Sequence, residues 1–439
     1  MRRLAGTTPP LLVALAAAAM LAACGSSGGG DSQTARAASA GGTGRAIEPP
    51  LGHNCQELIA LGLGMVAQRI YDAARHGNVV GQAVNRVKTS TALARAVSAD
   101  DAPAARAALR SLMAGQIVGV QVMKAGKVFA TVGSGVAIAP VSGGVAGTNA
   151  TFTLSTQRAD SYLKVAHQVT GADVVLLDGS SPEGRAHPIA STLPVGTLPV
   201  RLPLFGRVQL TGHAAHAFSL GVSQFPAGAL RIVLLVPPTH GPSCEGSREQ
   251  AASETLGHVG ERIYHEEADS PTVRATLHHI EADHGFQQAV AARDSTAIRA
   301  AIVRFFGEHI HVVRVRVYAV EPSGAQRFLY DLGGPYVLAP VHGVVRSAGR
   351  IVGKFSYAIQ DDAGYLRLAH LFTGAEILMR TGGKQVTGTL DPGPFRIPHR
   401  GLVTYRGKHY AAYSFTGEAF PSGPLQISLL TPIGEGPDD

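Results

Sequence analysis

The stretch "GYLRLAHLFTGAEILM" at residues 364–379 has a close echo in "SYLKVAHQVTGADVVLL" at residues 161–177. Tyr365 and Tyr162 lie 203 residues apart, and the Thr-Gly-Ala triplets that follow them keep the same offset. Two helices that resemble each other by chance do not preserve their spacing in this way. The pattern therefore indicates that a structural unit of this chain has been duplicated.

The repeat extends over most of the chain. "RIY" at 69–71 recurs at 262–264 with an offset of 193, "APV" at 139–141 recurs at 339–341 with an offset of 200, and "FP" at 225–226 recurs at 420–421 with an offset of 195. The offset changes because residues have been gained or lost between the matching elements. We therefore predict two domains, at residues 55–238 and 244–432.

The order of elements is clearest in the second copy. Apolar residues at helical spacing predict a long N-terminal helix over 247–285, broken near Ser270 and Pro271, and a second helix over 296–306 with Asp294 or Ser295 as its cap. The first copy has a similar capping pattern, in which Asp101 caps a helix that has Pro103 in its first turn.

The period then changes from helical spacing to alternation. "HVVRVRVYAV" at 311–320 places Val and Arg on opposite faces, as a strand with one solvated face requires. Further short apolar runs follow, separated by Gly, Pro or Asp. The predicted class is α+β, with two tandem domains that each have a long N-terminal helix and a mainly antiparallel sheet.

The first residues indicate export. Arg2 and Arg3 precede a short apolar run, and Leu21-Ala22-Ala23-Cys24 follows it. This end resembles the lipobox of bacterial lipoproteins, which implies a signal peptide at 1–23 and a lipid on Cys24. An ordinary secretory signal with a chance cysteine is the alternative. The Gly- and Ser-rich residues from 24 to 54 are expected to form a flexible tether.

Composition narrows the possible partners. The chain is 45% hydrophobic and 16% charged, with a net charge of +7, and its Lys and Arg residues are interspersed with acids in the sequence. We expect no nucleic-acid partner and only weak attraction to anionic lipid or wall polymer. No second apolar run is long enough to predict a transmembrane helix.

Two cysteines remain after Cys24. Cys55 and Cys244 each precede the first helix of a repeat, and an exported chain can oxidise such a pair. We predict a disulfide between them, and two independent buried thiols are the alternative.

The arrangement resembles the Cache family, the PAS-like extracytoplasmic sensor domains of bacterial chemoreceptors and histidine kinases. The resemblance rests on the long leading helix, the block "GRIVGKFSYAIQDDAGYLRLAHLFTGAEILMRTGGKQVTGTL" and the closing pair of long strands. It implies a small-molecule pocket between the sheet and the mid-domain helix. We expect the chain to depart from most of that family, because its sequence predicts no membrane-spanning helix after the signal and no cytoplasmic output domain.

Candidate ligand-binding residues cluster before and within the predicted helix of the second copy: Gln360, Asp361, Asp362, Tyr365 and Arg367. A carboxylate, a phenol and a guanidinium together suit an amino acid, an amine or a small polar metabolite. In the alternative reading an Asp only caps the helix and the tyrosine packs in the core. The first copy contributes Tyr162 at the matching position.

Other chemistry has little support in the sequence. The histidines of "LHHIEADHG" at 277–285 face several directions around a helix, and His213 and His216 fall in a predicted hairpin, so we expect no metal site. No nucleophile elbow or phosphate-binding loop is present, so we expect no cofactor and no enzymatic activity. The sequence favours a membrane-anchored sensory lipoprotein that binds a small ligand and contacts a membrane signalling partner. A surface scaffold with filled pockets is the alternative.

Overall fold

The computed structural model describes residues 55–113, 116–133, 135–179, 188–238, 247–308, 312–334 and 338–433. The chain divides into two compact units, Met1–Glu245 and Gly246–Asp439, here called unit 1 and unit 2. In the described ranges, no helix combines the length and apolar character needed to cross a membrane. Cys24 and Cys244 lie outside these ranges, so the lipid anchor and the disulfide remain predictions. Cys55 is the first residue of α2.

Unit 1 begins with a long helix and a group of short ones. The helices are α2 (Cys55–His76), α3 (Asn78–Lys88), α4 (Thr91–Ser98), α5 (Ala102–Leu112) and, later in the chain, α6 (Ala159–Thr170). Asp101 caps α5 by accepting a hydrogen bond from the amide of Ala104, as its position in the sequence predicts.

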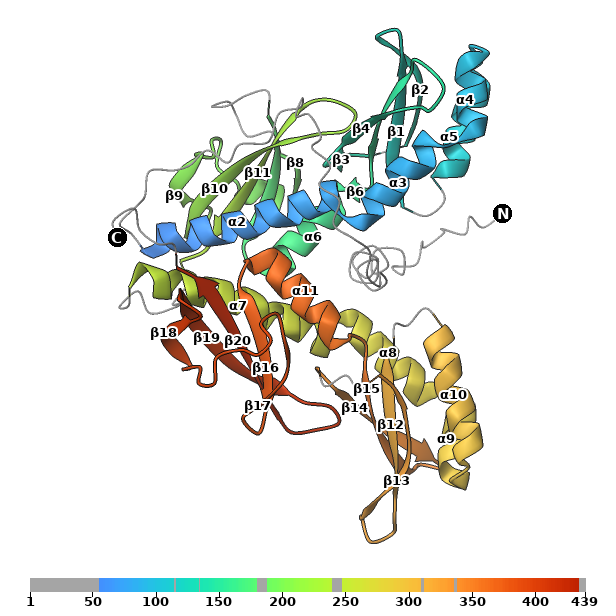
Figure 1. Cartoon of the computed structure of the whole chain (residues 1–439), viewed down its shortest axis with the longest axis vertical. Coiled ribbons are helices and arrows are strands. Elements are labelled where there is room, and N and C mark those ends of the chain that lie inside the picture. Colours follow the sequence, from blue (N-terminus) through green and yellow to red (C-terminus); the bar gives the residue numbers. More distant parts are fainter. Residues whose placement is uncertain are drawn as a thin grey trace. The chain divides into compact units, whose positions relative to one another are not determined.

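The strands of unit 1 form two main antiparallel sheets (Figure 1). The four-stranded sheet has the order β2-β1-β5-β4 and consists of β1 (Gly119–Lys124), β2 (Lys127–Gly133), β4 (Val141–Gly144) and β5 (Thr151–Ser155). The five-stranded sheet has the order β8-β7-β11-β10-β9 and consists of β7 (Asp173–Asp178), β8 (Pro188–Ser191), β9 (Phe205–Gln209), β10 (Ala214–Ser223) and β11 (Ala229–Val236). A short pair, β3 (Ala137–Ile138) and β6 (Gln157–Arg158), forms a separate two-stranded sheet.

Unit 2 repeats this plan. Its helices are α7 (Arg248–Asp269), α8 (Pro271–Ala282), α9 (His284–Ala292), α10 (Ser295–Gly307) and α11 (Asp362–Thr373). The break predicted near Ser270 is confirmed, because Ser270 caps α8. A second break follows at Asp283, which caps α9 and was not foreseen. Asp294 caps α10 through the amides of Thr296 and Ala297.

The sheets of unit 2 correspond to those of unit 1. The four-stranded sheet has the order β13-β12-β15-β14 and consists of β12 (Arg314–Val320), β13 (Gln326–Gly333), β14 (Val341–Ser347) and β15 (Arg350–Ala358). The five-stranded sheet has the order β17-β16-β20-β19-β18 and consists of β16 (Glu376–Thr381), β17 (Lys384–Gly388), β18 (Arg400–Tyr405), β19 (Lys408–Glu418) and β20 (Pro424–Pro432). Both five-stranded sheets therefore place their first and last strands side by side in the middle.

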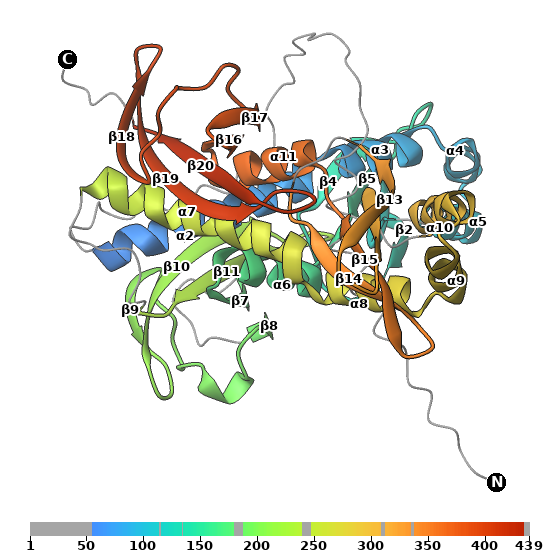
Figure 2. The same ribbon diagram turned by 90° about the horizontal axis from the view of Figure 1, so that it is seen from below.

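The long helix of each unit packs closely on its five-stranded sheet. In unit 2, α7 lies along β19 and β20 (Figure 2). A Cβ atom on Gly257 of α7 would lie 2.1 Å from the Tyr413 ring, and one on Gly64 of α2 would lie 2.3 Å from the Phe218 ring. Glycine at these two positions is what lets the helix approach the sheet.

These observations confirm the predicted α+β class with antiparallel sheets. The prediction of one sheet per domain was incomplete, because the strands of each unit separate into a four-stranded and a five-stranded sheet. Each four-stranded sheet has its own apolar core against the short helices. Alternation in sequence identifies strands but does not show where one sheet ends and the next begins.

Candidate functional site

The two predicted tyrosines lie in the cores of their units. Tyr365 is fully buried on α11, and its hydroxyl donates to the carbonyl of Gly260 on α7 at 3.0 Å. Tyr162 is equally buried and donates to the carbonyl of Ala67 at 2.9 Å. Burial raises the pKa of both phenols well above the usual value. Each tyrosine therefore joins the mid-domain helix to the long helix and contributes no surface to a ligand.

The other predicted residues are dispersed around the start of α11. Asp361 caps the helix by accepting from the amide of Gly364, and Gln360 packs over that glycine. Asp362 is buried and accepts a hydrogen bond from the amide of Leu338 at 3.1 Å. Arg367 is exposed one turn further along the helix. The structure does not bring these side chains together around one space.

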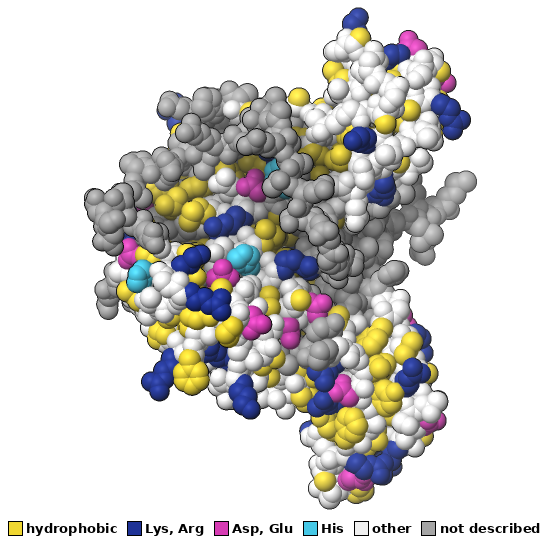
Figure 3. Space-filling view, viewed as in Figure 1, with side chains coloured by type: hydrophobic (Ala, Val, Ile, Leu, Met, Phe, Trp, Pro, Cys, Tyr) yellow, Lys and Arg dark blue, Asp and Glu magenta, His cyan; other side chains and the backbone are white. Residues whose placement is uncertain are grey.

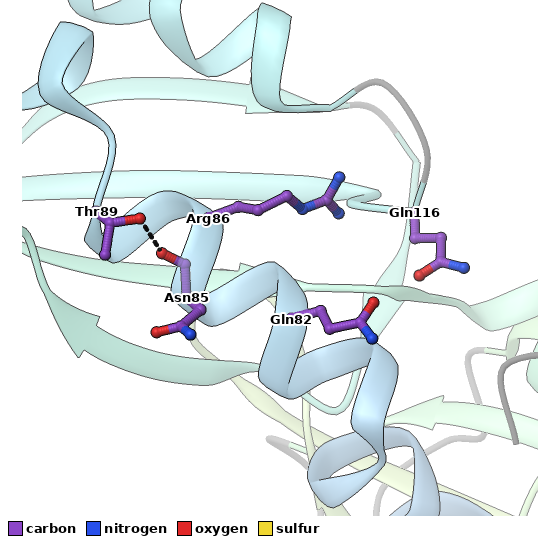
Figure 4. Close-up of a pocket in the computed structure, with 5 residues that line it drawn as sticks. All are labelled: Gln82, Asn85, Arg86, Thr89 and Gln116. Carbon is purple, nitrogen blue, oxygen red and sulfur yellow. Dashed lines mark hydrogen bonds between the residues drawn. The ribbon is translucent and has the colours of Figure 1, made fainter. Parts of the chain in front are cut away.

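A polar pocket of about 670 Å³ lies in unit 1 (Figure 4). It is lined by Gln82, Asn85 and Arg86 of α3, by Thr89, and by Gln116. Thr89 uses its hydroxyl to close its own helix, donating to the carbonyl of Asn85 at 2.8 Å. The four side chains on and beside α3 are exposed, so this pocket is open and its amide groups already have access to water.

A more ordered polar arrangement crosses the four-stranded sheet of unit 2. Strand register places one residue from each strand side by side, and these four residues are here called the charged row: His342, Ser356, Arg316 and Asp331. They lie on the face opposite the apolar core, since Val315, Val317 and Phe355 alternate with them toward the helices.

Side-chain hydrogen bonds join residues at both ends of the charged row. Nδ1 of His342 lies 3.0 Å from the hydroxyl of Ser356, and Nε2 of His342 lies 2.9 Å from a carboxylate oxygen of Glu418 on β19. At the other end, Arg314 and Arg316 both donate to Asp331. Arg314 also lies over the ring of Phe420, 4.3 Å from its centroid. The row therefore connects the four-stranded sheet to the end of β19.

The charged side chains at the end of the row that contains Arg316 and Asp331 are partly buried. The side chains of Arg314 and Asp331 are 14% and 21% exposed. Burial alone would raise the pKa of Asp331, but hydrogen bonds from Arg314 and Arg316 outweigh it and hold that pKa below its ordinary value. Asp331 therefore stays ionised, and both guanidinium groups are oriented by one carboxylate.

Unit 1 has a neutral version of the same row. Register aligns Ser142, Thr153, Gln121 and Thr131, here called the neutral row, in the same order across β4, β5, β1 and β2. The Ser142 and Thr153 hydroxyls lie 3.0 Å apart, and Gln121 donates to Thr131 at 3.3 Å. Four matched positions thus carry Ser, Thr or Gln in unit 1, whereas three of the four carry His, Arg or Asp in unit 2.

The residues next to the two rows also differ in charge. The amide of Glu418 donates to the hydroxyl of Tyr264, and in unit 1 the amide of Ser223 donates to Tyr71 in the same way. In unit 1, Ser223 therefore occupies the position of Glu418, the residue that binds His342 in unit 2. Gly119 replaces Arg314, and a Cβ atom there would lie 2.6 Å from the Phe225 ring.

The charged row was missed at the sequence level, although one signal for it was visible. The alternation of Val with Arg at 311–320 predicted a strand with one polar face, and Arg314 and Arg316 lie on that face. What the alternation cannot supply is the partner strand, because Asp331 meets Arg316 only through the register of β12 with β13.

The histidines noted in the sequence are dispersed. His279 pairs with Glu308 at 2.6 Å, and His284 lies 3.2 Å from Gln287. Over the ranges that the structure describes, no three His, Cys, Asp or Glu side chains come together as a candidate metal site.

Comparison with solved structures matches several chains, among them two structures of one periplasmic domain. No family model matches the chain, and no curated protein matches it either. The crystal structure of the periplasmic domain of Vibrio cholerae LuxQ aligns with 41% of this chain and 100% of its own length, at 11% identity and a TM-score of 0.30. Its selenomethionine form aligns with 42% of this chain and 97% of its own, at 12% identity and a TM-score of 0.25. Likeness at this level carries no argument about this chain, so its function has to be inferred from the residues themselves.

Proposed function

We propose that this protein is an extracytoplasmic, non-catalytic binding module, anchored by a lipid on Cys24, that recognises a small polar ligand at the charged row of unit 2. The observation that carries the proposal is the contrast between the two rows. Duplication gives both units the same scaffold, and unit 2 alone has charged side chains at the matched positions on the outer face of the sheet. Partly buried charges destabilise a fold unless they are compensated, so their concentration in one copy indicates a role beyond stability.

The chemistry of the row favours a ligand with an acidic group and a hydrogen-bond donor. Arg316 is held in place by Asp331 and presents a guanidinium suited to a carboxylate. Glu418, which is 43% exposed, offers an acceptor to an amine at the other end. An amino acid or a related small zwitterion combines both groups.

The test is a thermal-shift screen of the full chain carrying Cys24→Ser, against amino acids, amines and carboxylates. A ligand that binds only the folded state stabilises it by about 2.7 kcal/mol at a hundredfold excess over Kd. We expect Arg316→Gln to remove the ligand-induced shift and the matched change Gln121→Ala in unit 1 to preserve it. If Gln121→Ala removed the shift and Arg316→Gln did not, the site would belong to unit 1.

Two further measurements complete the test. Mass spectrometry should recover the ligand unchanged after incubation, because the proposed role is non-catalytic. Cys24→Ser should also release the protein from membranes that are washed in high salt, which screens contacts between charges. Full retention in the membrane fraction after this wash would contradict lipid anchoring through this residue.

The second candidate is a scaffold that acts through protein contacts. The helix-facing side of the four-stranded sheet in unit 2 is filled by Phe286, Phe305 and Phe355. The ring centroid of Phe286 lies 5.6 Å from that of Phe305 and 5.8 Å from that of Phe355. Unit 1 is filled there by Phe152 and small aliphatic side chains. If no compound in the screen stabilises the protein, the scaffold becomes the better hypothesis.

A further inference from the structure

The loop between β17 and β18 of unit 2 holds an aromatic side chain in solvent. Phe395 is 88% exposed, more than any other large hydrophobic side chain in the described part of the chain. Leu402 on the adjoining edge strand is 69% exposed. Figure 3 shows hydrophobic side chains over β17 and β18, flanked by Lys and Arg.

The backbone that carries Phe395 is fixed from several directions. Arg380, which is buried, donates to the carbonyls of Pro394 and Phe395. The side chain of Gln385 donates from Nε2 to the carbonyl of Leu390 at 2.8 Å, and its Oε1 accepts from the backbone amide of Gly393 at 3.0 Å. Because these hydrogen bonds fix the backbone of the loop, Phe395 is held in its exposed position.

The inner side of the loop completes a small core on the sheet face opposite α7. Leu390 and Ile397 pack against Leu378, Tyr410 and Leu430 of the five-stranded sheet. The loop therefore packs these two partly buried side chains against the sheet and presents Phe395 outward. A loop that needed only to cover the sheet would have no use for an exposed phenylalanine.

The same stretch concentrates positive charge. Residues 380–409 contain six Lys or Arg residues and one acid, Asp391, whereas the whole chain has 38 and 31. Lys384, Arg396, Arg406 and Lys408 are all exposed. The even mixture of charges expected from the whole sequence therefore does not hold for this stretch.

We propose that the β17–β18 loop of unit 2 is a contact site for an anionic lipid bilayer, with Phe395 entering the interface and Arg396 and its neighbouring cations meeting lipid phosphates. An apolar side chain set among cations is the combination that interfacial membrane binding requires. A soluble polyanion would use the cations but would gain nothing from Phe395 or Leu402. The charge and the exposed ring together favour a membrane.

The test is vesicle flotation with the full chain carrying Cys24→Ser, so that a lipid on that residue cannot contribute. Vesicles of phosphatidylcholine alone are compared with vesicles that also contain phosphatidylglycerol. We expect binding to the anionic vesicles that weakens with salt, about tenfold weaker binding for Phe395→Ser and about fivefold for Arg396→Gln. Val303→Ser, at a 48% exposed position on α10, is the matched control and should bind normally.

Two outcomes would overturn this proposal. One is anionic-vesicle binding by Phe395→Ser as tight as that of the parent chain. The other is competition by soluble polyglutamate that abolishes vesicle binding of the parent and of Phe395→Ser at the same concentration, which would assign the surface to polyanions. Neither outcome bears on the charged row, because the ligand screen does not use vesicles.

Discussion

Unit 1 and unit 2 share their architecture and differ in their polar chemistry. Both have a long helix that approaches its sheet through a glycine, a tyrosine that binds a backbone amide near the end of a long strand, and the same strand orders. Yet Gln121 and Thr131 in one become Arg316 and Asp331 in the other. The comparison shows that the packing positions are shared by the two units, while the outer face of the four-stranded sheet differs in charge.

The same contrast occurs where the long helix meets the five-stranded sheet. In unit 2, Tyr413 donates to Glu261 at 2.8 Å, and the guanidinium of Arg400 lies 3.6 Å from the centroid of the Tyr413 ring. In unit 1 the matching strand positions are Phe218 and Phe205, whose rings meet edge to face at 6.4 Å. Charged groups have again replaced apolar packing in unit 2.

The largest predicted effect concerns the close contact between long helix and five-stranded sheet that both units share. Gly257→Ala and Gly64→Ala should each destabilise their unit by about 3 kcal/mol, because the new methyl group would overlap a packed aromatic ring. Urea unfolding of the full chain measures this. Gly81→Ala on α3 is the control, since nothing lies within 4 Å of its Cβ position, and it should stabilise by about 0.5 kcal/mol. Comparable stability of all three variants would show that the close approach is not needed.

The next prediction uses a buried carboxylate that only unit 2 has. Glu267 on α7 is 4% exposed, and burial, followed by repulsion from Glu266 and Asp361, raises its pKa from 4.5 to about 7. Ala74 lies at the matching position of unit 1. Because the folded-state pKa is higher than the unfolded one, this residue's contribution is most favourable below pH 4.5 and is lost as pH rises toward 7.

Glu267→Gln should therefore remove this dependence on pH. At pH 8 the variant should be more stable than the parent by about 2 to 3 kcal/mol, and near pH 4 the two should agree within about 0.5 kcal/mol. Thermal unfolding across that range measures the difference. The same gain in stability at both pH values would assign the effect to packing.

The third prediction compares how much the charged row and the neutral row contribute to stability. Asp331→Asn should destabilise unit 2 by about 2 kcal/mol, because two partly buried guanidinium groups would lose their shared carboxylate. Thr131→Asn in unit 1 should change stability by less than about 0.5 kcal/mol. The Asp331 contribution is present above its unfolded pKa near 3.8 and is lost as pH falls through the lower folded value. Equal effects of the two changes would remove the energetic distinction between the rows.

The smallest effect concerns helix caps. Asp361 caps α11, whereas Arg158, at the same place before α6, makes no side-chain cap within the described structure. Asp361→Ala should cost about 1 kcal/mol, and Arg158→Ser should gain about 0.5 kcal/mol. The second change also removes an exposed pair with Asp160, which contributes little. Chemical unfolding followed by circular dichroism would detect both changes, and a loss of stability in Arg158→Ser would show that the arginine has another role.

Much of the fold was predictable because its signals are local. Asp101, Ser270 and Asp294 were identified as caps or breaks from short stretches, and all three cap helices in the structure. The Thr-Gly-Ala triplets used to detect the repeat end both mid-domain helices, with Gly171 and Gly374 in the left-handed conformation. The separation of strands into two sheets was not predictable, since it depends on pairing between distant segments.

The candidate site was predicted less well for the same reason. Tyr365 and Asp362 are adjacent to polar residues in sequence, but the turn of α11 directs the tyrosine to α7 and the aspartate to Leu338. The alternative reading, in which an Asp caps the helix and the tyrosine packs in the core, describes Asp361 and Tyr365 as the structure has them. Arg316 and His342 are neighbours only through Ser356, whose strand lies between theirs.

The hydrogen bond from the Glu418 amide to the Tyr264 hydroxyl slows hydrogen exchange at that amide. The backbone N–H of Glu418 is held by a hydroxyl on α7 at 2.7 Å, while the carboxylate of the same residue binds His342 at 2.9 Å on the four-stranded sheet. Deuterium can replace that proton only when the strand end separates from the helix. The exchange rate of this single amide therefore records how firmly the end of β19 is held on α7. A ligand that engages the Glu418 carboxylate at the charged row would change that rate without touching α7.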